Sequence, residues 1–167
     1  GRGQAPAPLA LPAGFEGADG ILAAGGDLKN TFTLVTRGQA IVSPHIGDAA
    51  NASTAADGRH QLAHYAALFD CRATRLAVDR HPDCRPTLAC RAHAPDAPVV
   101  PVQHHHAHLS AAMAEHGHPM HAPPVLGIVL DGAGLGADGS LWGGEFLRAD
   151  YRRCDRLGHF VPVPLPG

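Results

Sequence analysis

The sequence has few aromatic residues, no excess of either charge and no long apolar run. Aromatic residues make up 5% of its 167 residues, and 13 Lys and Arg against 15 Asp and Glu give a formal net charge of −2. A chain without a basic field cannot hold a nucleic-acid backbone nonspecifically, so nucleic acid is a poor candidate partner. Without an apolar span of about 20 residues, we also expect no membrane partner.

The cysteine pattern predicts neither a disulfide framework nor a structural zinc site. The four cysteines are Cys71, Cys84, Cys90 and Cys154, and no two of them make a C-x-x-C pair. No signal peptide is evident, so we expect a reducing, cytoplasmic setting. The simplest role of these cysteines is that of small buried apolar residues.

Glycine and proline, by contrast, are abundant. The 20 Gly and 15 Pro exceed a fifth of the chain, but 45% hydrophobic residues in clear runs argue against disorder. One globular domain, or part of one, is expected. The chain has no initiator Met and residues 1–12 contain three prolines. We therefore expect it to begin in mid-protein with an extended, linker-like segment.

Apolar periodicity predicts a chain of strands and helices. Strands are expected at 21–24, 32–36, 40–43, 74–78, 98–102, 125–130, 140–147 and 155–163, and helices at 54–69, 86–93 and 104–116. Gly117 is expected to cap the last helix. The continuous apolar run Val125–Leu130 predicts a central strand that is buried on both faces.

One structural plan occurs twice in the chain. Ile21–Val35 and Val125–Leu147 each run from an apolar strand, through a glycine-containing turn with an acidic residue at its start, into a return strand. Such a duplication favours an α/β fold with two facing lobes. The actin-like, sugar-kinase and Hsp70-type ATPases make a nucleotide cleft in this way.

A histidine cluster, His104-His105-His106-Ala107-His108, begins the helix expected at 104–116. Residues i and i+4 share a helix face, so His104 and His108 can offer two imidazoles to one ion, whereas His105 and His106 point elsewhere. A carboxylate is the usual third ligand for Zn²⁺ or Fe²⁺. Spacing alone leaves a second interpretation open, a solvated helix start that binds no metal.

Asp131 directly follows the apolar strand at 125–130. Its carboxylate is expected at the strand's carboxyl end, where ligand sites form in α/β sheets, although a turn residue before Gly132 is the alternative. Gly132, Gly134 and Gly136 allow backbone N–H groups to approach an anion closely. Because a strand follows this loop, it is not a Rossmann fingerprint, and a phosphate cradle is a hypothesis.

Other polar residues lie at turns and strand ends. Lys29 and Asn30 occupy the matching turn of the first hairpin, where a cation and an amide could face phosphate or carbamoyl oxygens, with a solvated turn as the alternative. Three further pairs are more often structural when each is taken alone: His45 with Asp48, Asp79 with His81, and Trp142 with Glu145.

Seven segments, taken in order, resemble one family of enzymes. They are Asp27–Phe32, Ser43–Asp48, Asp79–Asp83, Val102–His108, Asp131–Gly136, Leu141–Glu145 and Pro162–Gly167. Together they resemble the carbamoyltransferases of NiFe-hydrogenase maturation, the HypF family, over nearly the whole chain. The resemblance implies an enzyme that uses carbamoyl phosphate and ATP, by way of carbamoyl-adenylate. Its carbamoyl acceptor would be the C-terminal cysteine of a partner maturation protein, for synthesis of the cyanide ligand.

The resemblance also implies a division of the chain. Residues 1–16 would be a linker from a preceding YrdC-like nucleotide-binding domain, 17–122 the first lobe of the transferase-like domain, and 123–167 the truncated start of its second lobe. Because the other half of the cleft would then be missing, we expect the isolated chain to have little activity.

The same resemblance assigns roles to individual residues. His104, His108 and Asp131 would bind the metal, either Fe or Zn, with Mg²⁺ as a further candidate. Lys29, Asn30 and Asp131 would be catalytic. The nucleotide, ATP or the adenylate, would contact a further set of residues: Gly132, Gly134, Gly136 and Glu145.

Some positions depart from the family pattern. Ala133 replaces a larger residue, often Thr, and Cys84 and Pro86 replace the Tyr and Ser that follow Asp79–Asp83. Two alternatives to the carbamoyltransferase are a tRNA threonylcarbamoyladenosine transferase-like protein and an inactive metal- or nucleotide-binding module. The tRNA-modifying proteins usually have Glu-Gly where this chain has His106-Ala107, and this difference disfavours the first alternative.

Overall fold

A computed structural model of the chain describes residues 7–27 and 30–163. Its contacts divide the chain into two compact units. Unit 1 comprises Gly1–Leu11 and Phe15–Val102, and unit 2 comprises Pro12–Gly14 and Gln103–Gly167. In the described part of the chain, no helix is long and apolar enough to cross a membrane.

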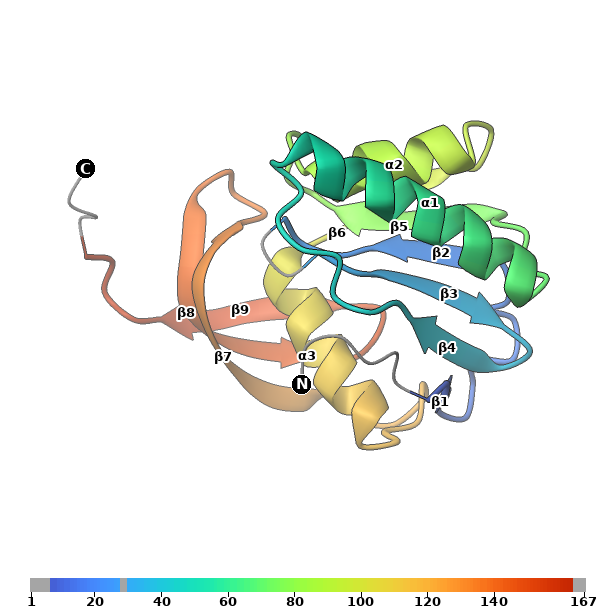
Figure 1. Ribbon diagram of the computed structural model, residues 1–167. Helices are drawn as coiled ribbons and strands as arrows, with labels where there is room; N and C mark the ends of the chain where they lie inside the picture. Colours follow the sequence, from blue (N-terminus) through green and yellow to red (C-terminus); the bar gives the residue numbers. More distant parts are fainter. Residues whose placement is uncertain (1–6, 28–29, 164–167) are drawn as a thin grey trace. The chain divides into compact units, whose positions relative to one another are not determined.

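Unit 1 is built on a six-stranded mixed sheet with the strand order β1-β4-β3-β2-β5-β6. Its strands are β1 (Leu9–Ala10), β2 (Ile21–Ala24), β3 (Phe32–Thr36), β4 (Gln39–Val42), β5 (Arg75–Asp79) and β6 (Val99–Val102). The strands from β2 to β4 pair antiparallel, whereas β5 runs parallel to both β2 and β6. Parallel pairs need crossover connections, and these contain α1 (Ala52–Leu68) and α2 (Arg85–His93). Figure 1 shows the two helices side by side over one face of this sheet.

The core of unit 1 lies between this sheet and α1. Leu22, Leu34 and Leu76 come from β2, β3 and β5 and are fully buried, and Leu62 of α1 packs against them. The helix begins where Asn51 accepts a hydrogen bond from the backbone N–H of Ser53 at 3.0 Å. Such a cap satisfies one of the N–H groups that the first helical turn leaves without a partner.

Residues 9–11, which belong to the expected linker, contact the sheet of unit 1. Leu9 and Ala10 are extended, as expected, but they also pair with β4 and extend the sheet. The backbone N–H of Leu11 then donates to Gly38 at 3.0 Å. This pairing depends on a distant strand edge, so the local proline-rich composition gives no sign of it.

Unit 2 consists of α3 (His104–Glu115) packed on a three-stranded antiparallel sheet. The strands are β7 (Val125–Leu135), β8 (Leu141–Ala149) and β9 (Cys154–His159), in the order β7-β8-β9. Val129, Trp142 and Leu147 form the small core, and Leu109 of α3 packs against it. Gly117 has a φ of +67° at the end of α3, as expected of a capping glycine.

The expectation that Val125–Leu130 is a central, fully buried strand is wrong. Within the described sheet β7 is an edge strand, and its residues alternate between buried and exposed. Leu126, Ile128 and Leu130 are 68%, 61% and 72% exposed. The apolar residues of β7 thus occupy both faces of the strand, but within unit 2 only one face is covered.

The expected glycine loop after this strand is also different. β7 continues to Leu135, so Gly132 and Gly134 lie inside the strand, and its pairing with β8 is irregular between Leu130 and Gly134. The turn follows instead at Gly139, whose φ is +80°. At the far end, β9 stops at His159 and does not continue to residue 163 as expected.

Candidate metal centre

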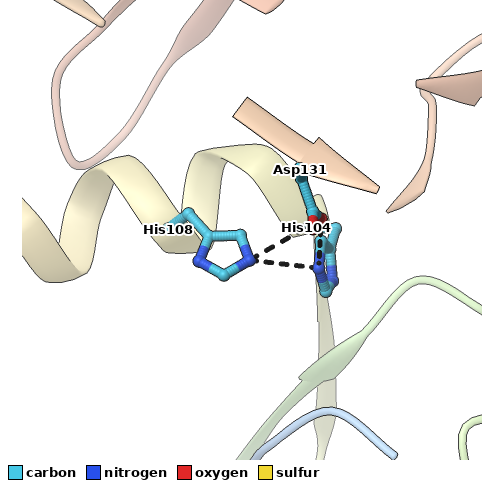
Figure 2. Close-up of side chains that lie close together, drawn as sticks. All are labelled: His104, His108 and Asp131. Carbon is cyan, nitrogen blue, oxygen red and sulfur yellow. Dashed lines mark hydrogen bonds and ion pairs between the residues drawn. The ribbon is translucent and has the colours of Figure 1, made fainter. Parts of the chain in front are cut away.

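Three side chains of unit 2 converge at the start of α3, as Figure 2 shows. His104 and His108 come from successive turns of the helix, and Asp131 comes from the irregular part of β7. Asp131 Oδ2 lies 3.0 Å from His104 Nε2 and 3.8 Å from His108 Nε2. The two imidazole Nε2 atoms are 3.2 Å apart.

These distances match three ligands of a single ion. When an ion has tetrahedral coordination and bonds of about 2.1 Å to nitrogen and oxygen, its ligand atoms lie about 3.4 Å apart. One ligand atom from each residue lies within 4.8 Å of the other two, and the described residues contain no other such group of His, Cys, Asp or Glu. Asp131 Oδ2 is also buried without a hydrogen bond of normal geometry. A carboxylate oxygen in that state, facing two imidazoles, fits a metal better than a solvated helix start.

The two oxygens of Asp131 have different roles. Oδ1 accepts a hydrogen bond from the backbone N–H of Gly132 at 2.7 Å, while Oδ2 faces the imidazoles. The turn-like contact and the metal-facing position were alternatives from the sequence. In the structure Oδ1 makes the turn-like contact and Oδ2 lies beside His104, while metal binding by Asp131 stays a prediction.

His105 and His106 point away from this cluster, as the helical spacing predicts. His106 Nε2 lies 2.7 Å from the backbone oxygen of Asp150. His105 is fully buried, with its ring 5.9 Å from that of Trp142. Burial lowers the pKa of His105, which keeps this imidazole neutral.

Gln103 both starts the helix and fixes the tautomer of His105. Its Oε1 accepts a hydrogen bond from the backbone N–H of His106 at 2.8 Å, so Gln103 caps α3. Its Nε2 then faces His105 Nδ1 at 3.0 Å, and an amide nitrogen can only donate. His105 therefore accepts at Nδ1 and carries its proton at Nε2, an atom that is buried and without a partner among the described groups.

Gly134 allows the helix to approach β7 this closely. A Cβ atom at position 134 would lie 2.7 Å from His105 Cε1 and 2.9 Å from both Cβ and Cδ2 of His104. Gly136 is similar, because a Cβ there would overlap the indole ring of Trp142. Both glycines therefore have a packing role, whereas a Cβ at Gly132 would meet nothing within 4 Å.

A buried ion pair lies in the same sheet. Glu145 on β8 is 1% exposed, and Arg156 on β9 donates to it through two nitrogens, at 2.6 and 2.9 Å. The Arg156 guanidinium also lies 4.2 Å from the centre of the Trp142 ring. Burial would raise the pKa of Glu145, but hydrogen bonds from Arg156 and from the N–H of Gly143 outweigh burial and lower it. A nucleotide contact through Glu145 stays a prediction.

Two family profiles match the chain. The HypF Kae1-like domain matches residues 16–115, and the second subdomain of the carbamoyltransferase Kae1-like domain matches residues 127–167. The first match alone covers more than half of the chain. The chain belongs to the HypF Kae1-like domain family.

Curated relatives and solved structures agree with this assignment. The carbamoyltransferase HypF of Rhodobacter capsulatus is 46% identical over 168 residues, which are 99% of this chain and 23% of the relative. A HypF homolog of Cupriavidus necator is 40% identical over 94% of this chain and 39% of its own length. The chain thus spans only part of each relative.

The solved structures lead to the same conclusion. HypF from T. kodakarensis has a TM-score of 0.83 and 34% identity, over 99% of this chain and 21% of its own. Full-length HypF in a phosphate- and nucleotide-bound form has a TM-score of 0.76 and 36% identity, over 89% of this chain and 19% of its own. The α/β fold with a mixed sheet is therefore that of a HypF Kae1-like domain.

Lys29 and Asn30, in the HypF-like turn at 27–32, were both predicted to be catalytic. Lys29 lies outside the described residues, so its catalytic role stays a prediction. Asn30 belongs to unit 1, is 7% exposed, and accepts the backbone N–H of Ile46 at 2.9 Å through its carbonyl oxygen. Asn30 is among the residues that line a cavity of about 420 Å³ in unit 1, and its catalytic role also stays a prediction.

The other strand-end pairs mostly stabilise turns. Asp48 accepts the backbone N–H of Ala50, and Asp79 accepts that of His81, both at 2.8 Å. The helix after Asp79–Asp83 forms despite the departures from the family pattern. It begins at Arg85 with Cys84 as its cap residue.

Sequence reasoning missed Arg156 and Asp138. Asp138 accepts the indole N–H of Trp142 at 3.0 Å and also two hydrogen bonds from Ser140, one from its backbone N–H and one from its hydroxyl. Its partner Trp142 packs in turn against Arg156. Arg156 reaches this position because β9 pairs with β8, with an irregularity between Phe146 and Leu147. An isolated arginine in a polar stretch gives no local signal of such a partner.

Proposed function

We propose that the full-length protein containing this chain is a carbamoyltransferase of NiFe-hydrogenase maturation. It would act in the cytoplasm on carbamoyl phosphate and ATP, form a carbamoyl-adenylate, and pass the carbamoyl group to the C-terminal cysteine of a partner maturation protein. The name carbamoyltransferase, which the curated relatives share, supports this proposal. So does the solved relative in its phosphate- and nucleotide-bound form.

The observation that carries the proposal is the convergence of His104, His108 and Asp131 within 4.8 Å. Two imidazoles and a carboxylate are the donor set of Zn²⁺ and Fe²⁺ sites, and they suit Mg²⁺ less well. When bound, the ion would act as a Lewis acid that polarises the carbamoyl or phosphate oxygens of the adenylate. The three residues would hold the ion, and the contact from Gly132 to Asp131 Oδ1 would orient the carboxylate.

The raised pKa values of the cysteines in this chain support a nucleophile that comes from the partner protein. In the transfer step a partner thiolate would form the new bond to the carbamoyl carbon, and the bond from that carbon to AMP would break. Burial raises the pKa of Cys90 to about 12 and also raises those of Cys71, Cys84 and Cys154. Thiols in that state are protonated near neutral pH and are poor nucleophiles.

The nucleotide contacts belong to the same proposal. Gly132 has no neighbour within 4 Å of a Cβ position, so its backbone is open to a close approach by an anion. We propose that Gly134, Gly136 and Glu145 also contact the nucleotide. Lys29 and Asn30 of the first hairpin would line the same cleft. We further propose that the fold is an actin-like, sugar-kinase or Hsp70-type ATPase fold, in which this chain supplies the first lobe and the opening hairpin of the second.

The experiment is a thiocarbamate assay with the full-length protein and a peptide that ends in the partner's cysteine. His104→Ala should lower transfer by at least about 100-fold, because removal of one ligand leaves two. His116→Ala is the matched control, since His116 is an exposed residue at the other end of α3. An unchanged rate of carbamoyl transfer in His104→Ala would contradict the metal-dependent mechanism.

A further inference from the structure

A second cavity, in unit 1, has a different chemistry from the metal centre. It measures about 400 Å³ and lies where the end of β5 meets α2 and β6. Val78, Val99 and Pro101 supply its apolar lining. Polar groups come from the loop after β5 and from α2, and they carry the inference.

The nitrogen donors of the cavity are the guanidinium groups of Arg80 and Arg91 and the imidazole of His81. Neither guanidinium has an ion-pair partner among the residues that the structure describes. Asp79 is the one carboxylate in the described lining, and its Oδ1 accepts the backbone N–H of His81. Two like charges around one hollow repel each other, so an anion between them is favoured, and the concave shape strengthens the field.

The ring of His81 can donate a hydrogen bond from Nε2. The backbone N–H of Asp83 donates to His81 Nδ1 at 3.3 Å, so in the neutral ring the proton is on Nε2. The backbone at Arg80 is positioned by a hydrogen bond from its N–H to the carbonyl oxygen of Val102 at 3.1 Å. These contacts hold the loop after β5 beside the cavity.

Thr87 provides the observation that points to a ligand. It is 7% exposed, lines the cavity, and its hydroxyl has no hydrogen-bond partner of normal geometry. The thiol of Cys84 lies close to it, but sulfur is a weak hydrogen-bond partner. A buried hydroxyl without a partner is uncommon in proteins because it loses its bonds to water and gains none in return. Thr87 lies four residues before Arg91, so both side chains are on the same face of α2.

We propose that this cavity binds an oxyanion, the phosphate or carboxylate group of a small molecule. Arg80 and Arg91 would clamp its oxygens, since a guanidinium presents paired N–H groups that match phosphate and carboxylate geometry. The Thr87 hydroxyl and His81 Nε2 would donate to the remaining oxygens. The apolar lining from Val99 and Pro101 would contact the body of the ligand. This site is independent of the proposed carbamoyl transfer.

The test is methyl NMR of the full-length protein with labelled threonine, in which the Thr87 signal is identified by its loss in Thr87→Val. Inorganic phosphate and acetate are titrated separately, so that the two anion classes are told apart. We expect saturable shifts of the Thr87 methyl signal with at least one anion, with a dissociation constant on the order of a millimolar. No shift with either anion would overturn the proposal.

Two variants separate a specific site from general charge effects. Arg91→Gln and Arg80→Gln should each weaken binding about tenfold, the effect of one charge-assisted contact. Arg72→Gln, at an exposed arginine outside the cavity lining, should change it less than about twofold. An unchanged dissociation constant in both cavity variants would also overturn the proposal. Thr87→Val itself should fold normally, since replacing an unsatisfied buried hydroxyl by a methyl group is close to neutral.

Discussion

Asp131 Oδ2 lies 3.0 Å from His104 Nε2, although the two residues are 27 positions apart in the chain. The contact joins the start of a helix to the irregular centre of an edge strand. Three features outside the three proposed ligands hold this contact in place: Gly134, the Gln103 cap and the sheet register. Substitutions at such positions can therefore test the contact without removing a ligand.

Gly134→Ala should damage both packing and metal binding. The added Cβ would lie 2.7 Å from His105 Cε1 and 2.9 Å from His104 Cβ, so the helix start must shift. We expect a loss of about 1–3 kcal/mol in the free energy of unfolding, measured by urea denaturation, together with weaker metal binding. Gly17→Ala, at an exposed glycine with no neighbour within 4 Å, should be nearly neutral. Equal stability of the two variants would contradict the packing role of Gly134.

Arg156→Leu should destabilise the protein more than a surface substitution does. It leaves the Glu145 carboxylate, 1% exposed, without its bidentate partner. The expected loss is about 3 kcal/mol in the free energy of unfolding, measured by urea denaturation at neutral pH.

The double variant Glu145→Gln/Arg156→Leu tests the origin of that loss. Because it removes the uncompensated charge as well, it should recover part of the stability lost in Arg156→Leu. A double variant as unstable as the sum of the two single variants would show that the pair does not interact. Arg152→Leu, an exposed arginine, is the control and should change stability little.

Acid unfolding should depend on Asp138. Hydrogen bonds from Ser140 and Trp142 lower the pKa of Asp138 to about 2, against 3.8 for an ordinary aspartate. The folded state therefore binds this proton less readily than the unfolded state. The contribution is complete above pH 3.8 and is lost as the pH falls toward about 2. In Asp138→Asn this part of the pH dependence of stability should vanish, as measured by circular dichroism, and an unchanged acid limb would refute the assignment.

The isolated 167-residue chain should bind metal weakly and transfer little carbamoyl group. It supplies two imidazoles and one carboxylate, and it spans 23% of the length of its Rhodobacter capsulatus relative. Equilibrium dialysis against Zn²⁺ and the thiocarbamate assay are the measurements. Tight stoichiometric metal binding or turnover by this chain alone would contradict the expectation.

The helical part of the metal centre could be predicted from the sequence because it depends on local geometry. His104 and His108 share a face whenever a helix begins at residue 104, and Gln103 starts one there. Asp131 was predictable as a strand-associated carboxylate but not as a residue inside a longer strand. That outcome depends on the irregular pairing of β7 with β8, which is a property of two strands together.

The remaining features depend on tertiary partners that a single stretch of sequence does not reveal. The packing role of Gly134 is set by the approach of His105, and the partner of Glu145 is set by the register of β9. The alternation of exposure along Val125–Leu130 likewise follows from the packing of α3 on one face of β7 only. The proposed function could be predicted from the family resemblance of the sequence, whereas the cavity around Thr87 is visible only in the structure.

The most direct test of the metal centre is metal binding by the full-length protein and by its Asp131→Asn variant. The change keeps the size of the side chain but replaces the buried carboxylate oxygen by a weaker ligand or an N–H group. We predict at least about a 100-fold loss of affinity for Zn²⁺ or Fe²⁺, with Asp57→Asn, an exposed aspartate of α1, unchanged. Equal metal affinity in wild type and Asp131→Asn would contradict the account.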